Sequence, residues 1–417
     1  MKKKVLIIGN SAKEYALARK LSSDNEVYVA PGSLAVAEFA KCVDIREDAD
    51  KELLDFVLEN GIDITIPVSL RSLRSGVVDL FNQNGQQVFA PSNAVSSLIF
   101  DKAAIKKLFY KLRVPTPKFG IFEKQSMAYD YIKNLKTPFV IKTNEPSSSV
   151  VLNSPKVGKL LLDSYFVNKN QKVIIEDYIW GTPFVFYIIT DGYKASSIGS
   201  ALLYKHSLEG DGGQLTDGMG ACSPNYKLSL DNEYFIMDNV VYPLLEYLSS
   251  GDTPYLGVMG VNGVLSEDGS ISILGVCPFM QDCDCSAILE NLDLELLPLV
   301  ESCVVGSFSD DVDVIRQKTQ FATSLVLVSK NKNGNATSIL GLEELDEDTK
   351  VDFYPAIYKN KYLELETLGG NVLVLTTIGG TISRSTVKAY EEAKCLSFKG
   401  LYYRKDIGKP LSNDCRF

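Results

Sequence analysis

Strand and helix signals alternate through the N-terminal quarter of the chain, and this alternation constrains the fold more than any other feature. An apolar run at 4–8 precedes a helical pattern at 12–22, and a short strand is expected at 27–29. A helix near 50–59 and a strand at 63–67 continue the series. Strands separated by helices of this length form βαβ units, so the pattern predicts a doubly wound parallel sheet.

The length of the chain indicates more than one compact unit. Its 417 residues exceed what a single hydrophobic core normally supports, so about three units are expected. The first unit should close near Pro115 and Pro117, because prolines interrupt the helical pattern there. The predicted segments are an N-terminal α/β domain at 1–101, a small α+β lobe at 102–190, a central domain at 191–320 and a β-rich C-terminal domain at 321–417.

The remaining elements are predicted from apolar runs and from the positions of glycine. We expect helices at 72–84, 102–112, 231–249 and 384–394, strands at 88–89, 139–141, 173–175, 255–265, 271–276, 323–328 and 372–377, and a glycine-rich loop at 210–220.

Charge and hydropathy exclude several classes of partner. Lys and Arg number 43 against 52 Asp and Glu, a net charge of −9, and no basic cluster follows Lys2–Lys4, so a nucleic acid polymer is not expected. Only four apolar residues then pass before Gly9, too few for a signal peptide. Nowhere do about 18 apolar residues run without interruption, so we expect no membrane span and a cytoplasmic protein.

Cysteine and histidine usage argues against a metal site and against imidazole chemistry. Of eight cysteines, only Cys277, Cys283 and Cys285 lie close together, and their spacing does not match a CxxC pair. Buried thiols are therefore favoured over zinc, and no metal site is predicted. The single histidine, His206, has no nucleophile signature beside it and is interpreted as a surface or loop residue.

The loop after the first predicted strand is a candidate anion site. It runs from Gly9 to Ala18 as GNSAKEYALA, a small-residue turn that leads into a helix. Free N–H groups and the positive end of the helix dipole suit a phosphate or carboxylate. A turn that merely packs strand against helix is at least as consistent with this pattern.

Further motifs give this loop a family context. It resembles the G-x-G-G-R-E-H-A-L-A opening of phosphoribosylamine–glycine ligases, and VYVAPG at 27–32 is similar to the stretch that follows in them. The collinear resemblance extends through GID at 61–63, GVVD at 76–79, APS at 90–92, PFVIK at 138–142, IEDYIWG at 175–181, TDGMGACSP at 216–224 and FKGLYYRKDIG at 398–408.

This resemblance implies an ATP-grasp fold with an N-terminal doubly wound domain, a small lobe, a central domain and a C-terminal β-rich domain. The family forms an amide between glycine and phosphoribosylamine in purine biosynthesis, with ATP activating the glycine carboxylate. The resemblance implies nucleotide contacts from Lys102, Lys142, Glu176 and Ile179. It implies substrate contacts from Gly9, Ser11, Lys13, Glu14, Lys205, Thr216, Gly218, Met219 and Gly220.

The positions that should bind metal depart from the family pattern. The family has E-F-N on a strand, with two ligands on one face because residues two apart share a side. Leu274 and Val276 occupy those positions and offer no oxygen, so magnesium is not expected. The family continues with R-F-G-D, and this chain has Pro278 to Gln281 in those positions. Asp282 and Asp284 could replace these groups, but a solvated acidic loop is the favoured interpretation.

The positions that should bind phosphate and substrate also differ. The loop at 145–151 contains Pro146, which donates no N–H, and Val150 in place of a lysine. Where the family has SQDHKR, this chain has ALLYKH at 201–206, and Leu215 replaces the asparagine that the family has before Thr216. The N-terminal loop keeps Glu14 but has Lys13 and Tyr15 where the family has arginine and histidine.

Two functions are therefore expected to compete. Loss at the metal, phosphate and substrate positions together indicates an impaired or inactive member of the family. The alternatives are a ligase rescued by Asp282, Asp284 or Glu267, and a silent paralogue that binds a nucleotide, a metabolite or a partner protein. The retained residues are compatible with ATP contact and equally with a residual scaffold, since Lys142 and Glu176 lie at strand ends where surface charges are common.

Overall fold

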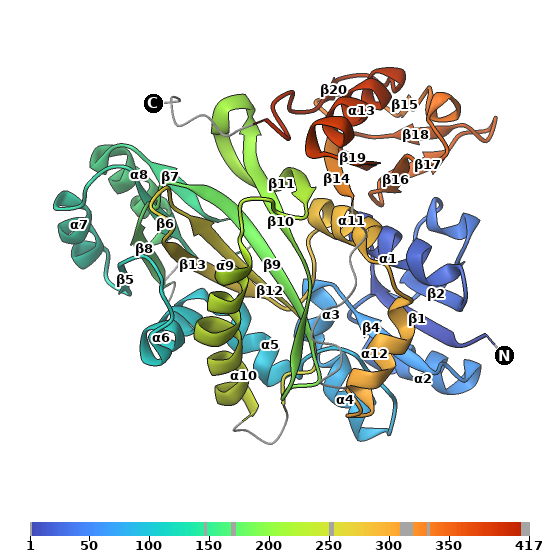
Figure 1. The fold of residues 1–417 in the computed structure, drawn as a ribbon, viewed down its shortest axis with the longest axis horizontal. Helices are drawn as coiled ribbons and strands as arrows, with labels where there is room; N and C mark the ends of the chain where they lie inside the picture. The colour runs from blue at the N-terminus through green and yellow to red at the C-terminus, as the bar shows by residue number, and fades with distance from the viewer. Residues whose placement is uncertain are drawn as a thin grey trace.

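The computed structural model describes residues 2–145, 148–167, 172–249, 254–308, 320–331 and 334–409. These residues form four sheets, of which the largest has nine strands and runs through the middle of the molecule (Figure 1). The smaller sheets lie around it, with the N-terminal domain at lower right, the small lobe at left and the C-terminal helix at top right. No helix of the described residues is long and apolar enough to span a bilayer.

The N-terminal sheet is parallel and doubly wound, as its alternating pattern predicted. Strands β1 (Lys4–Gly9), β2 (Glu26–Pro31), β3 (Lys41–Cys42) and β4 (Ile64–Pro67) lie in the order β3-β2-β1-β4. Side chains alternate between its faces: Val5 and Ile7 pack with α1 (Ala12–Ser22), whereas Leu6 and Ile8 pack with α2 (Asp50–Asn60) and α4 (Val77–Gln83).

Two predictions for this domain were wrong in detail. The helix expected at 72–84 is divided into α3 (Leu70–Ser75) and α4, because Gly76 between them has φ 110°, outside the helical range. The strand expected at 88–89 is a single bridge, in which Val88 pairs with Thr65. Helices α5 (Asn93–Phe100) and α6 (Lys102–Leu112) follow and lead to the small lobe.

The small lobe is an antiparallel sheet with one apolar and one polar face. Strands β5 (Phe119–Phe122), β6 (Phe139–Lys142), β7 (Val150–Leu152) and β8 (Val173–Asp177) lie in the order β5-β8-β6-β7. Alternate residues of β6 and β8 pack against α7 (Gln125–Lys133) and α8 (Pro155–Tyr165). The other side chains of these strands, among them Lys142 and Glu176, therefore face away from the helices.

The large sheet joins the central and C-terminal parts of the chain. Its order is β13-β12-β9-β10-β11-β14-β19-β16, with β20 beside β14, and adjacent strands are antiparallel. The strands are β9 (Thr182–Thr190), β10 (Ala195–Leu208), β11 (Gly212–Ser223), β12 (Gly257–Leu265), β13 (Ile271–Cys277), β14 (Phe321–Ser329), β16 (Lys350–Phe353), β19 (Gly370–Gly379) and β20 (Leu401–Tyr402). The loop expected at 210–220 is mostly strand β11, because its residues pair with β10 in a long hairpin.

Helices cover both faces of this sheet. One apolar cluster joins α5, α6, α9 (Leu230–Ile236), a π-helical turn (Met237–Val241) and α10 (Tyr242–Ser249). The opposite face packs against α11 (Asp282–Asn291), α12 (Leu296–Val304) and α13 (Ile382–Cys395). The described C-terminal part adds a small sheet of β15 (Thr337–Ser338), β17 (Ile357–Lys359) and β18 (Leu365–Thr367).

A buried arginine fastens the C-terminal segment to the β10–β11 hairpin. Arg404 is fully buried, and its guanidinium donates to both carboxylate oxygens of Asp406 at 2.7 and 2.8 Å. It also donates to Asp211 at 3.0 Å and to the backbone oxygen of His206 at 2.9 Å. The last described strand and the hairpin are thus tied together by one side chain.

We expect Arg404→Met to lower the free energy of unfolding by about 3 kcal/mol, because it leaves two carboxylates without their buried partner. Urea denaturation followed by circular dichroism would measure the change. The neighbouring Lys405 is exposed, so Lys405→Met should leave the urea midpoint unchanged. Equal midpoints for the two variants would contradict the role assigned to Arg404.

Candidate functional site

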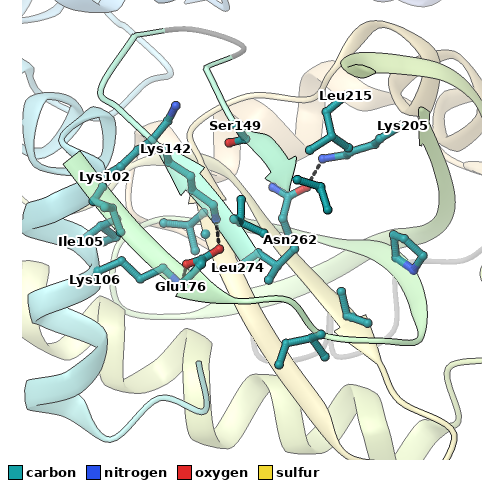
Figure 2. A pocket seen from close by; sticks show the side chains of 18 of the residues that line it. Lys102, Ile105, Lys106, Lys142, Ser149, Glu176, Lys205, Leu215, Asn262 and Leu274 are labelled. Atoms are coloured by element: carbon teal, nitrogen blue, oxygen red, sulfur yellow. Dashed lines mark hydrogen bonds and ion pairs between the residues drawn. The ribbon is translucent and has the colours of Figure 1, made fainter. Parts of the chain in front are cut away.

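A cleft of about 420 Å³ lies between the polar face of the small lobe and the edge of the large sheet. Helices α3, α5 and α6, strands of the small lobe, the β10–β11 hairpin and strands β12 and β13 all contribute to its wall. Figure 2 shows Lys102, Lys142 and Glu176 on one side, and Lys205 with Asn262 on the other. The predicted site residues that line it are Lys102, Lys142, Glu176, Ile179, Lys205 and Thr216.

A buried carboxylate held by two lysines forms one wall of the cleft. Glu176 is 1% exposed; it forms an ion pair with Lys142 and another, at 3.0 Å, with Lys106. Burial alone would raise the pKa of Glu176, but Lys142 and Lys106 outweigh it and lower that pKa. Of the two alternatives that the sequence left open for Lys142 and Glu176, the ordinary surface charge does not agree with this burial.

Sequence reasoning missed Lys106, although the spacing of the lysines could have revealed it. Asp101 accepts hydrogen bonds from the N–H groups of Ala103 and Ala104, which fixes the start of α6. Lys102 and Lys106 then lie four residues apart on one helix face, and both line the cleft. Lys106 also donates to the Thr116 hydroxyl at 2.6 Å.

Lys102 is held by neutral oxygens. Its ammonium donates to the backbone oxygen of Glu145 at 2.9 Å and to the Ser148 hydroxyl at 3.2 Å. Burial, followed by repulsion from Lys142, lowers the pKa of Lys102 to about 8. Pro146 and Ser147, which belong to the expected phosphate loop, lie outside the described residues.

A β-bulge decides what strand β13 presents to the cleft. Pairing with β12 shifts by one residue after Asn262, so that Leu274 is the extra residue in β13. Val276 packs against the same apolar cluster as Ile273, whereas Cys277 packs against the opposite face. Leu274 and Val276 both line the cleft, and neither side chain offers an oxygen ligand.

The sequence favoured a solvated acidic loop for the two aspartates after this strand, and the structure contradicts that interpretation. Asp284 is 1% exposed and accepts hydrogen bonds from the Tyr187 hydroxyl at 3.2 Å and the Gln281 N–H at 2.8 Å. Burial raises the pKa of Asp284 to about 7, against the opposing effect of Lys205. Asp282 faces the N-terminal loop and accepts from the Lys13 N–H at 3.0 Å.

The N-terminal loop forms a separate polar site. Ser11, Lys13 and Glu14 line an open cavity of about 620 Å³, and Ser11 donates to Asp282 at 2.7 Å. Lys13 donates to the Ser11 hydroxyl at 2.8 Å and pairs with Glu14 at 3.2 Å. A Cβ on Gly9 would lie 2.1 Å from the Glu14 carboxylate, so glycine is needed there to accommodate this buried acid. The α1 N-terminus is thus partly satisfied by the protein's own Asp282.

The predicted substrate residues on the hairpin have different surroundings. Lys205 donates to the Asn262 side chain at 3.2 Å, and the Thr216 hydroxyl donates to the Lys205 backbone oxygen at 2.9 Å. Gly218, Met219 and Gly220 follow in β11 and do not line the cleft. Met219 is buried and Gly220 pairs with Leu325 of β14, so these positions support the sheet.

His206 was expected on the surface or in a loop, and this prediction was wrong. It lies on β10, is half-buried and lines the cleft, with Nδ1 3.5 Å from the Gly213 oxygen. Burial lowers the pKa of this imidazole. The prediction was based on the absence of a nucleophile signature beside His206, and that absence carries no information about burial.

Family models match most of the chain. They are phosphoribosylglycinamide synthetase, N domain, at residues 3–98, its ATP-grasp (A) domain at 100–285 and its C domain at 325–410. The phosphoribosylamine–glycine ligase of Caldanaerobacter subterraneus subsp. tengcongensis is 28% identical over 415 residues, covering 97% of this chain and 99% of the relative. That of Neisseria meningitidis serogroup A is 28% identical over 426 residues, covering 98% and 100%.

Solved structures agree with these matches. The phosphoribosylamine–glycine ligase of Thermotoga maritima gives a TM-score of 0.82 at 21% identity, covering 97% of this chain and 100% of that one. The biotin carboxylase domain of Hydrogenobacter thermophilus 2-oxoglutarate carboxylase, solved with MgADP, gives 0.71 at 14% identity, covering 96% and 92%. The family resemblance and the predicted ATP-grasp fold class, with its N-terminal doubly wound and C-terminal β-rich domains, are confirmed.

We expect Glu176→Gln to lower the free energy of unfolding by about 3–5 kcal/mol, because two buried lysines would lose their common counter-ion. Chemical denaturation measures this change. Adding Lys106→Met to the variant should restore part of the loss, since it removes one of the unpaired charges. A single variant as stable as the unchanged protein would contradict the structural role of this cluster.

Proposed function

The chain belongs to the phosphoribosylglycinamide synthetase family, and we propose that it binds an adenine nucleotide in the cleft but has lost most of the family's ligase chemistry. One observation carries this proposal. The Lys142–Glu176–Lys106 cluster is complete on one wall, whereas strand β13 on the facing wall offers Leu274 and no oxygen ligand.

Nucleotide binding is supported by the chemistry of the cleft. Lys102 and Lys142 provide positive charge for phosphate groups, and apolar side chains such as Ile179 and Val140 provide surface for a base. The ion pairs of Glu176 fix the position of Lys142, so this lysine needs little rearrangement when an anion binds. We propose Lys102, Lys142, Glu176 and Ile179 as the nucleotide site.

Substrate contacts remain a separate proposal. Lys205 and Thr216 lie in the same cleft and are the hairpin residues best placed to meet a second ligand. Ser11, Lys13 and Glu14 line the other cavity, where their own hydrogen bonds already satisfy much of their polarity.

Magnesium does not fit this site. A hard cation needs oxygen ligands, and β13 lines the cleft with Leu274, Gly275 and Val276, whose side chains offer none. Within the described ranges, no three Asp, Glu, His or Cys side chains gather in a way that could hold a metal ion. Phosphoryl transfer depends strongly on charge neutralisation by metal, so the missing ligands argue against efficient ligation.

The rival proposal is a ligase rescued by substituted carboxylates. Asp282, Asp284 and Glu267 are its candidates, and none of the three lines the cleft. Asp282 faces the N-terminal loop, Asp284 is buried against Tyr187, and Glu267 is exposed in the turn between β12 and β13. Their positions favour loss of activity over rescue.

We expect calorimetric titration with ADP and ATP to give the same affinity in magnesium and in EDTA. A tenfold gain with magnesium, about 1.4 kcal/mol, would show that a metal site exists. Absence of any binding would overturn the nucleotide proposal. Glycine-dependent phosphate release in the presence of phosphoribosylamine and ATP, abolished by Lys142→Ala, would instead establish the rival proposal.

Nucleotide affinity should also depend on the charge of Lys102. A lysine whose pKa is lowered to about 8 is cationic below that pH and neutral above it, so nucleotide affinity is highest at low pH and declines as the pH rises through about 8. We expect ADP affinity to fall about tenfold between about pH 7 and about pH 9. Lys102→Met should bind more weakly at neutral pH and show no such decline. A decline of the same size in that variant would assign the titration to another group.

A further inference from the structure

We infer that Arg74, Lys102 and Lys142 form an anion site that binds the phosphate groups of the nucleotide without metal. This inference rests on the proposed function and extends it, because it names the residue that would replace the missing metal charge. Arg74 comes from the N-terminal domain, whereas the two lysines come from α6 and the small lobe. The site would therefore join three parts of the chain around one ligand.

Arg74 lines the cleft and also the cavity of the N-terminal loop. It lies on α3 and lines the cleft together with Lys102 and Lys142. Its guanidinium carbon lies 5.2 Å from the centre of the Phe100 ring, and Phe100 in turn contacts Phe279 at 6.5 Å between ring centres. Stacking on an aromatic ring fixes the plane of an arginine while its N–H groups remain available at the edge.

The cations of this site make few direct contacts with carboxylates. In the described parts of the chain, neither Arg74 nor Lys102 forms an ion pair with a carboxylate. Lys142 has Glu176, but that carboxylate is shared with Lys106. Acidic side chains such as Asp177 and Asp217 also line the cleft, and Asp217 acts to raise the pKa of Lys102. An anion that contacts Arg74 and Lys102 directly would nevertheless stabilise these two cations.

Electrostatic coupling between these groups supports the same conclusion. After burial and Lys142, Arg74 is a further cause that lowers the pKa of Lys102, while Asp217 and Glu145 act in the opposite direction. Arg74 is therefore close enough for its charge to influence the pKa of Lys102. The oxygens that Lys102 now contacts are neutral, so an anion could replace them with a gain in charge pairing.

The chemistry of the three groups favours phosphate. A guanidinium presents two parallel N–H donors that match two oxygens of a phosphate, and lysines add positive charge without fixed geometry. This arrangement would bind the diphosphate of a nucleotide or inorganic pyrophosphate, which share the same anionic group. The experiment must therefore compare adenosine, ADP and pyrophosphate.

The test is a calorimetric titration in EDTA of the unchanged protein, Arg74→Gln and Arg71→Gln. Arg71 is the matched control, because it lies one turn earlier on α3, is also exposed and does not line the cleft. We expect Arg74→Gln to weaken ADP binding about tenfold, the loss of one charged contact, and to leave adenosine binding unchanged. Arg71→Gln should change neither.

Each other outcome is decisive. Equal ADP affinity in Arg74→Gln and Arg71→Gln would overturn the anion site while leaving the nucleotide proposal intact. Equal weakening of adenosine and ADP would also overturn it, because Arg74 would then shape the cleft without contacting phosphate. If neither adenosine nor ADP binds, the proposed function fails. In that case pyrophosphate binding that is lost in Arg74→Gln would support an anion site alone, and its absence would overturn this inference as well.

Discussion

Glu176 lies buried between Lys142 and Lys106, and the cleft depends on this arrangement. The carboxylate belongs to the small-lobe sheet, Lys142 to the adjacent strand and Lys106 to helix α6. An isolated charge at this depth would be too costly to keep ionised, so each group requires the others. The cluster therefore fixes the helix against the sheet and at the same time aims a lysine into the cleft.

On the opposite wall of the cleft, one extra residue in strand β13 changes the faces that the following side chains take. The bulge at Leu274 turns Val276 toward the apolar cluster behind the sheet and brings Cys277 to the other face. Side chains alternate along a strand, so one inserted residue exchanges the faces of all that follow. The proposed nucleotide site consequently has its cations on one wall, and β13 lines the other with aliphatic side chains in place of oxygen ligands.

The parts of the chain are joined by buried ion pairs between distant segments. Arg404 ties the C-terminal segment to the β10–β11 hairpin, and Arg19 of α1 pairs with Glu290 of α11 at 2.8 Å and Asp352 of β16 at 3.0 Å. The first contact holds in place the hairpin that lines the cleft, and the second holds helix α11, whose N-cap residue Gln281 also lines it. Such residues do not touch the site, yet they determine its shape.

The sequence by itself determined the family, the order of the elements and most of the residues on the charged wall. Alternating apolar runs were enough for the N-terminal sheet, because their spacing depends only on local geometry. Only the tertiary structure decided which side chains meet. The burial of Asp284, the pairing of Glu176 with Lys106 and the face taken by Val276 depend on contacts between segments far apart in the chain. A charge pattern read along the sequence carries no information about burial, and burial is what distinguishes an ordinary surface lysine from one that shapes a binding site.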